Sequence, residues 1–264
     1  MNLQDKLQNK YVAFIDVLGF KELVNRRNTN TLETYFNTIR ETLELIRNDK
    51  KNIESLLVSD STILISPDSK EDFKTLLRAV QTIQSELVKQ DIWIRGAISY
   101  GEVYFDQESN LIVGKGLVNA YLLESTAKFP RVIIDTSIIP KIADNRKEFF
   151  DFVNPDNNNF RNDKLKLVHN WHKFTEEDNF YVSYAHRIII DSIEKKNLHL
   201  TYNKIKKNLY SDSKQYDKFL WVKKYFMDVL LDLEGRWGVI SANSITEKDN
   251  RAYLNKWWGK FTEM

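Results

Sequence analysis

The sequence predicts an α+β protein in which a ferredoxin-like sheet domain of βαββαβ order precedes a mostly helical C-terminal extension. Short β-branched runs alternate with stretches of helical periodicity in the first half of the chain, which is typical of such a sheet. After about residue 140, these runs give way to longer segments with apolar residues at helical spacing. We therefore expect a sheet domain at residues 1–140, and a helical extension at residues 141–264 that packs on it or on a partner chain.

The elements of the sheet domain follow one another with clear boundaries. Residues 10–17 are expected to form a strand, and residues 30–48 carry apolar side chains at the spacing of a helix. Residues 53–58 and 61–66 are the two strands of a hairpin with Asp60 at its bend. Further along we expect a helix over 69–89, a long strand over 92–105, a short strand over 111–116, a helix over 116–128 and a strand over 131–135. In the extension, helices are expected over 183–196 and 212–232.

Two aspartates lie inside apolar, strand-forming segments of this predicted sheet. Asp16 and Asp60 are 44 residues apart, and the split βαβ arrangement brings the ends of their strands to one edge. An ionised carboxylate in such a run is costly to desolvate unless a positive charge compensates it. A divalent metal held by both side chains would supply that charge, and such metals handle phosphates. The alternative is that they serve as capping or turn residues, Asp60 especially.

The composition excludes several classes of function. The chain has 264 residues and no cysteine, which rules out disulfides, thiolate catalysis and cysteine-bound zinc. Its 39 basic and 37 acidic residues are scattered, so neither a nucleic acid nor a membrane surface is an expected partner. The N-terminus lacks the apolar core of a secretory signal, and no stretch approaches the ~20 apolar residues of a membrane span. A cytoplasmic protein is therefore expected.

Four short segments match the sequence blocks of one enzyme family, in the same order. Residues 14–20 (FIDVLGF) match a F-x-D-x-x-G-F block, and Ser59-Asp60-Ser61 matches a hairpin that carries a second metal aspartate. Residues 95–102 (RGAISYGE) match a R-x-G-x-x-x-G-E strand loosely, with Gly96 displaced by one position. Residues 116–124 (GLVNAYLLE) match a helix that carries an asparagine. Over roughly residues 10–135, the chain resembles a class III nucleotide cyclase domain.

Within that family, the combination of segments resembles the pyrimidine cyclases of Pycsar antiphage systems. The resemblance implies that residues 1–140 are a catalytic domain that converts UTP or CTP to the 3′,5′-cyclic monophosphate and pyrophosphate. The product would be a second messenger in antiphage defence, read by a separate cyclic-nucleotide-responsive effector protein. It also implies a homodimer with composite active sites, each taking its metal aspartates from one chain and Asn119 from the other.

The resemblance also implies the residues of the site. Asp16 and Asp60 would hold two Mn²⁺ or Mg²⁺ ions, with the carbonyl of Val17 completing one coordination shell. Catalytic roles fall to these two aspartates together with Asn119, Arg95 and Arg131. Backbone N–H groups at the start of a helix suit phosphates, and here they belong to Leu18, Gly19 and Phe20. The nucleotide-binding set comprises Phe14, Leu18, Gly19, Phe20, Leu56 and Ile112.

Three departures from the family pattern bear on substrate and mechanism. Leu56 and Ile112 stand where purine cyclases use a lysine and an aspartate to read the base, which fits a pocket rebuilt for UTP or CTP. A purine cyclase with an unusual pocket is the alternative. Leu123 stands where purine cyclases place an arginine on the developing charge, so an active enzyme needs another cation. The candidates are Arg95, Lys115, Lys128 and Arg131.

Each of these candidates also has a structural interpretation. Arg95 could instead pair with Glu102 or Glu124, Asn119 could be a polar helix position, and Arg131 could be a surface strand residue. The missing arginine at Leu123 also leaves open a catalytically silent, cyclase-like module that binds nucleotides without turnover.

Overall fold

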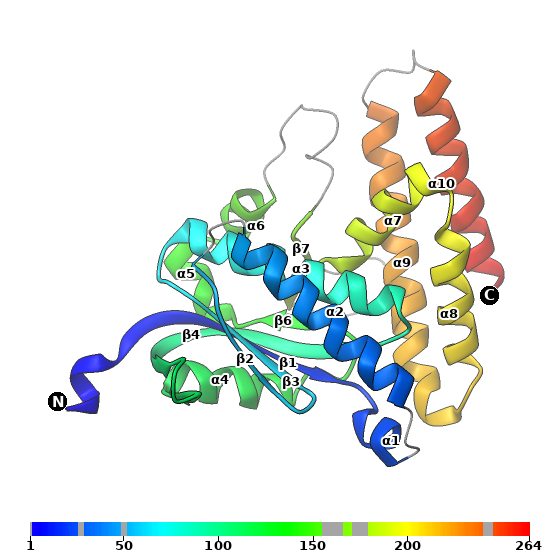
Figure 1. Ribbon diagram of the computed structural model, residues 1–264. Helices are drawn as coiled ribbons and strands as arrows, with labels where there is room; N and C mark the ends of the chain where they lie inside the picture. Colours follow the sequence, from blue (N-terminus) through cyan, green and yellow to red (C-terminus); the bar gives the residue numbers. More distant parts are fainter. Residues whose placement is uncertain (1, 26–28, 49–51, 155–165, 171–178, 240–244) are drawn as a thin grey trace. The chain divides into compact units, whose positions relative to one another are not determined.

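The computed structural model describes residues 2–25, 29–48, 52–154, 166–170, 179–239 and 245–264 (Figure 1). The chain divides into two compact units. The first comprises Met1–Pro155, Leu167–His169 and Asn179–Val182, and the second comprises Asp156–Lys166, Asn170–Asp178 and Ser183–Met264.

The first unit is built on a mixed sheet, and β1 (Gln8–Val17) is one of its inner strands. The strand order is β2-β3-β1-β4-β6-β8-β7, and β5 pairs with β4. All neighbours within β2-β3-β1-β4 are antiparallel, and β6 runs parallel to β4. This order confirms the ferredoxin-like βαββαβ sheet. The remaining strands are β2 (Glu54–Val58), β3 (Ser61–Ser66), β4 (Ile94–Asp106), β5 (Leu111–Val113), β6 (Val132–Ile134), β7 (Val168–Asn170) and β8 (Phe180–Val182).

Helices cover both faces of this sheet (Figure 1), with α2 and α3 on one face and α4 on the other. Side chains alternate between the two faces of a strand, so Tyr11, Ala13 and Ile15 of β1 enter the large core under α2 and α3. Val12 and Phe14 join a smaller core on the α4 side. The helices of this unit are η1 (Leu3–Lys6), α1 (Phe20–Asn25), α2 (Thr29–Asn48), α3 (Lys70–Lys89), α4 (Lys115–Glu124), η2 (Thr136–Ile138), α5 (Ile139–Ile142) and α6 (Arg146–Val153).

The sheet unit extends beyond the boundary expected after residue 140. Phe149 of α6 lies 6.0 Å from Phe73 of α3 and 5.0 Å from Phe180 of β8, ring centre to ring centre, inside the large core. Tyr181 of β8 pairs with Ile133 of β6. Strands of three residues are too short to show a period of two, which is why sequence periodicity missed β7 and β8.

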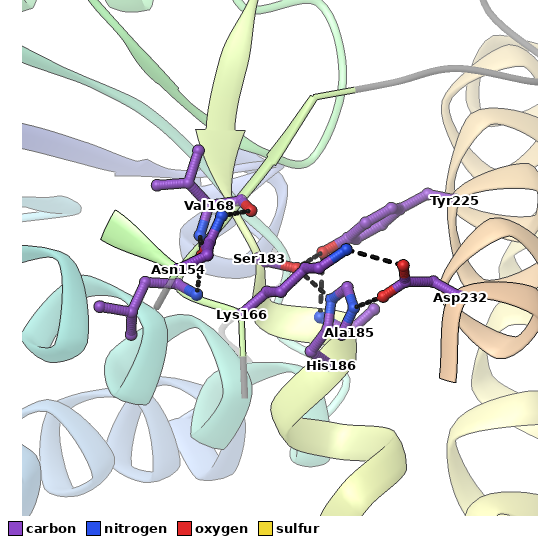
Figure 2. A network of polar contacts seen from close by, with 9 residues as sticks. Asn154, Lys166, Val168, Ser183, Ala185, His186, Tyr225 and Asp232 are labelled. Carbon is purple, nitrogen blue, oxygen red and sulfur yellow. Dashed lines mark hydrogen bonds and ion pairs between the residues drawn. The ribbon is translucent and has the colours of Figure 1, made fainter. Parts of the chain in front are cut away.

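A single side chain holds the end of α6 to the segment that begins β7 (Figure 2). The Asn154 amide donates to the Val168 carbonyl at 2.9 Å, and its oxygen accepts from the N–H groups of Leu167 at 2.8 Å and Val168 at 3.0 Å. The amide therefore satisfies buried backbone groups at the start of β7.

The second unit is helical. The predicted helices over 183–196 and 212–232 are confirmed as α7 (Tyr184–Lys195) and α9 (Ser213–Val239), whereas α8 (Leu198–Leu209) and α10 (Ile245–Glu263) were not predicted. The apolar side chains of α9 pack within this unit, where Phe226 stacks on Phe261 of α10 at 5.9 Å. No helix in the described part of the chain is long and apolar enough to cross a membrane.

A buried polar network joins α7 to α9 in this unit (Figure 2). The Ser183 hydroxyl lies 2.5 Å from Nδ1 of His186 and 3.1 Å from the Tyr225 hydroxyl. Nε2 of His186 lies 2.9 Å from Asp232, whose other oxygen accepts from Lys166 at 2.7 Å. The order Ser-His-Asp is that of a hydrolytic triad, but Ser183 and His186 are both 0% exposed. Because no substrate reaches a buried hydroxyl, we interpret the network as structural.

Tyr225 also completes the start of α7, where the first N–H groups of a helix have no partner within it. Its hydroxyl accepts from the Ala185 N–H at 3.1 Å. We predict that Tyr225→Phe lowers the free energy of unfolding by about 1–3 kcal/mol, because it leaves this N–H and the Ser183 hydroxyl short of a buried partner. Urea denaturation of the full chain measures the change.

The matched control is Tyr216→Phe on the same helix, where the ring is 43% exposed. It is expected to stay within about 0.5 kcal/mol of the unchanged protein. Equal effects of the two substitutions would contradict a structural role for the network.

Candidate functional site

The structure brings Asp16 and Asp60 together at one edge of the sheet. Asp16 lies near the end of β1, opposite Ser61 of β3 and Arg95 of β4 in the strand register. Asp60 directly precedes Ser61 in the turn between β2 and β3, where Ser59 adopts a left-handed conformation with φ of 58°. The two carboxyl groups are within hydrogen-bonding reach of one another. Residues distant in sequence thus form an acidic pair.

Negative charge accumulates at this pair. Burial, followed by the charges of Asp60 and Glu124, raises the pKa of the Asp16 carboxyl to about 7, while the Arg95 guanidinium opposes the rise. Two carboxyl groups this close cannot both ionise freely without a compensating charge. The pair is therefore a place where an added cation would be stabilised.

The Arg95 side chain is the cation beside the pair. Its Nε lies 2.5 Å from Oε1 of Glu124 and 3.8 Å from Oδ2 of Asp16. Of the two acidic partners that the sequence allowed, the structure selects Glu124, because Glu102 lies opposite Asn9 far along β4. Burial raises the pKa of the Glu124 carboxyl, against the lowering influence of Arg95.

Tyr35 of α2 holds the turn that carries Asp60. Its ring is buried, and its hydroxyl donates to the Asp60 carbonyl at 3.1 Å. Burial raises the pKa of this hydroxyl to about 12, so it remains a donor at neutral pH. In the sequence Tyr35 is one of several apolar positions of a predicted helix, and nothing there distinguishes it as an anchor.

In the turn after β1, the Leu18 N–H does not have the phosphate-facing role that the sequence suggested. The Leu18 N–H, expected to face phosphates, donates to the Trp93 carbonyl at 2.8 Å because the chain before β4 continues the pairing of β1. Gly19 has a φ of +79°, which L-residues with a side chain rarely adopt, and α1 starts at Phe20. The side chain of Val17 is buried in the core.

The expected base-contacting residues lie in one small apolar cluster. Phe14 of β1, Leu56 of β2 and Ile112 of β5 are partly buried against the core on the α4 side of the sheet. The Phe14 ring meets the Tyr121 ring edge-on, with 5.5 Å between centres. These three positions present only hydrocarbon.

The structure gives the other two expected catalytic residues different settings. Asn119 is exposed on α4. Arg131 is only 4% exposed, and its guanidinium lies over the rings of Phe129 at 5.6 Å and Tyr181 at 5.5 Å. Its setting is aromatic and buried, unlike that of a surface strand residue. Two further candidate cations, Lys115 and Lys128, are exposed.

Comparison with known proteins gives likeness at the level of fold. No protein-family model and no curated protein matches the chain. The adenylyl cyclase CyaB from P. aeruginosa is 22% identical with a TM-score of 0.39, over 52% of this chain and 82% of that one. The guanylyl cyclase domain of the RhoGC fusion protein from Blastocladiella emersonii is 14% identical with a TM-score of 0.44, over 67% and 95%. The guanylyl cyclase Cya2 is 11% identical with a TM-score of 0.42, over 67% and 90%.

The raised pKa of Asp16 predicts how stability depends on pH in the absence of metal. The folded protein holds the Asp16 proton more tightly than the unfolded chain, so stability falls as pH rises from about 3.8 to about 7. Asp16→Asn removes this loss and is expected to be more stable than the unchanged protein at pH 8, by on the order of 2 kcal/mol. Chemical denaturation in EDTA at pH 4 to 8 measures the difference.

The advantage of Asp16→Asn should shrink toward pH 4, where the Asp16 carboxyl is protonated in the folded protein and close to half protonated in the unfolded chain. Asp217→Asn, at an exposed position of α9, serves as the control and should show no such trend. An Asp16→Asn variant that is no more stable than the unchanged protein at pH 8 would contradict the charge repulsion described here.

Proposed function

We propose that this chain is a metal-dependent nucleotidyl cyclase that converts UTP or CTP to the 3′,5′-cyclic monophosphate and pyrophosphate. The observation that carries the proposal is the meeting of Asp16 and Asp60 at one edge of a ferredoxin-like sheet. In this reaction the ribose 3′-oxygen bonds to the α-phosphorus, the bond from that phosphorus to the bridging oxygen breaks, and the hydroxyl proton is released. Pyrophosphate carries the leaving charge.

The acidic pair fits two divalent ions, Mn²⁺ or Mg²⁺. Asp16 and Asp60 offer hard carboxylate oxygens in a half-buried place where their mutual repulsion favours a cation. Within the described residues no group of three acidic, histidine or cysteine side chains is arranged for a metal. The Val17 carbonyl, water and phosphate oxygens would therefore complete the coordination. Bound ions would lower the pKa of the attacking hydroxyl and neutralise the leaving group.

The hydrocarbon character of the expected base pocket counts against recognition of a purine by the lysine and aspartate that purine cyclases use at these positions. Leu56 and Ile112 provide no hydrogen-bonding group, and Phe14 beside them provides a flat apolar surface. A purine would leave its polar edge groups without side-chain partners at these positions, which is costly.

The placement of Asn119 supports a homodimer with composite sites. Asn119 and Glu124 are five residues apart on α4, so they project about 140° apart around the helix axis. Glu124 faces Arg95 of its own chain, whereas Asn119 is exposed. Next to Asn119, the side chains of Val118, Tyr121 and Leu122 are 53%, 56% and 58% exposed, an apolar face that a second copy would cover. A head-to-tail pair would bring each Asn119 to the partner's acidic pair.

The proposed role is a second messenger in antiphage defence, acting on a separate effector protein. It is supported by the sequence resemblance to pyrimidine cyclases described above.

The substrate proposal is tested by incubating the protein with each of the four nucleoside triphosphates and Mn²⁺. Cyclic UMP or cyclic CMP is expected, and Asp16→Ala should lower its formation at least about 100-fold. Asp217→Asn should leave it unchanged. Cyclic AMP or cyclic GMP instead would establish the purine alternative, and nucleotide binding without product would establish the silent module favoured by the apolar Leu123.

The composite site is tested by mixing two inactive variants, Asp16→Ala and Asn119→Ala. In a head-to-tail mixed dimer, one of the two sites has both residues intact, so an equimolar mixture should recover about one quarter of full activity. The rate of cyclic nucleotide formation, with each variant alone as control, measures the recovery. No recovery, in a mixture shown by native mass spectrometry to contain mixed dimers, would contradict the shared site.

A further inference from the structure

A carboxylate is buried at the last turn of α4. Glu124 is 4% exposed, and within the described residues its ion-pair partner is Arg95. Burying an ion pair costs desolvation free energy that the pair often does not recover, so two apolar residues in place of Glu124 and Arg95 would often be at least as stable. The charge at Glu124 therefore calls for an explanation beyond stability.

Arg95 approaches two carboxylates through the same nitrogen. Its Nε is 2.5 Å from Glu124 and 3.8 Å from Asp16, so the guanidinium is held nearer to the residue outside the acidic pair. Four of the five N–H groups of a guanidinium are on its terminal nitrogens, in a planar fork that matches phosphate oxygens. The Arg95 side chain is also 32% exposed, which leaves it open to a ligand at the site.

The balance of charge shows what Glu124 changes. Without its carboxylate, Arg95 would face only the acidic pair, and attraction would draw the guanidinium onto Asp16. If the Arg95 guanidinium bound Asp16 directly, it would occupy a carboxylate oxygen that a metal ion needs. It would also lie too far from a bound phosphate to contact it. The competing attraction of Glu124 prevents this direct contact.

We propose that Glu124 is a positioning residue that holds Arg95 beside Asp16, so that the Arg95 guanidinium contacts the phosphate oxygens of the nucleoside triphosphate. The inference rests on the proposed function and names the cation of the reaction. Leu123, the neighbour of Glu124, carries no charge, so α4 contributes the Glu124 carboxylate and the cation is Arg95 of β4. Arg95 stabilises negative charge on the phosphate, and Glu124 acts only through Arg95.

Chemical rescue with guanidinium ion tests whether Glu124 positions the Arg95 guanidinium or only balances its charge. Arg95→Ala is expected to lower kcat about 100-fold, and added guanidinium ion should restore part of the loss because Glu124 still binds it. In the double variant Arg95→Ala, Glu124→Gln, the same guanidinium concentration should restore little. Equal rescue in the two backgrounds would overturn the proposal.

The single variant Glu124→Gln tests the same contact without removing the arginine. It should lower kcat about 10- to 100-fold through misplacement of Arg95, and Glu124→Asp, which keeps the charge, should recover part of the loss. Glu108→Gln, in the exposed turn after β4, is the matched control and should behave as the unchanged protein. A Glu124→Gln variant with unchanged kcat would overturn the proposal, and thermal unfolding verifies that each variant is folded.

A binding measurement distinguishes failure of this inference from failure of the proposed function. Titration calorimetry with inorganic pyrophosphate and Mn²⁺ requires no turnover. Weaker binding by both Arg95→Ala and Glu124→Gln, relative to Glu108→Gln, supports the inference even if no triphosphate is cyclised. Unchanged binding by both variants refutes it even if cyclic UMP or cyclic CMP is formed.

Discussion

The repulsion between two half-buried carboxyl groups is the interaction on which the site depends. Asp16 is an even-numbered residue of β1 and therefore belongs to the α4 face, while its odd-numbered neighbours enter the large core. A slip of one residue in the register would exchange the faces and separate Asp16 from the Asp60 turn. The core packing of β1 thus maintains the acidic pair, because a slip of one residue would turn Asp16 and its even-numbered neighbours into the large core.

The two units treat buried polar groups in opposite ways. In the helical unit, Ser183, His186 and Asp232 are linked to one another and to Tyr225 and Lys166, so each group has a partner. Such a satisfied network specifies and stabilises a fold. At the edge of the sheet, Asp16 and Glu124 share the Arg95 guanidinium, Asp60 adds a third carboxylate beside Asp16, and the excess negative charge remains. Polar groups left unbalanced in an otherwise well-packed unit are typical of a functional site.

The fold could be predicted from sequence where apolar residues recur at a regular spacing over a whole strand or helix. Strand β1, the β2–β3 hairpin and the helices α2, α3, α7 and α9 follow from apolar spacing, because a repeated side-chain period directly reflects which face is buried. The short strands β7 and β8 show no such period. They exist because the core that contains Phe149 and Phe180 covers them, a contact between segments that local sequence does not record.

The sequence by itself determined which residues the proposed chemistry uses: two aspartates in apolar strands, an arginine on the next strand, and hydrocarbon at the expected base positions. Only the tertiary structure decided how they are joined. In the folded protein Arg95 pairs with Glu124 and not with Glu102. The Leu18 N–H donates to the Trp93 carbonyl, and the Tyr35 hydroxyl donates to the Asp60 carbonyl. The physical reason is that residue type and local period depend on the chain's own neighbours, whereas an ion pair or hydrogen bond depends on strand register and helix packing between distant segments.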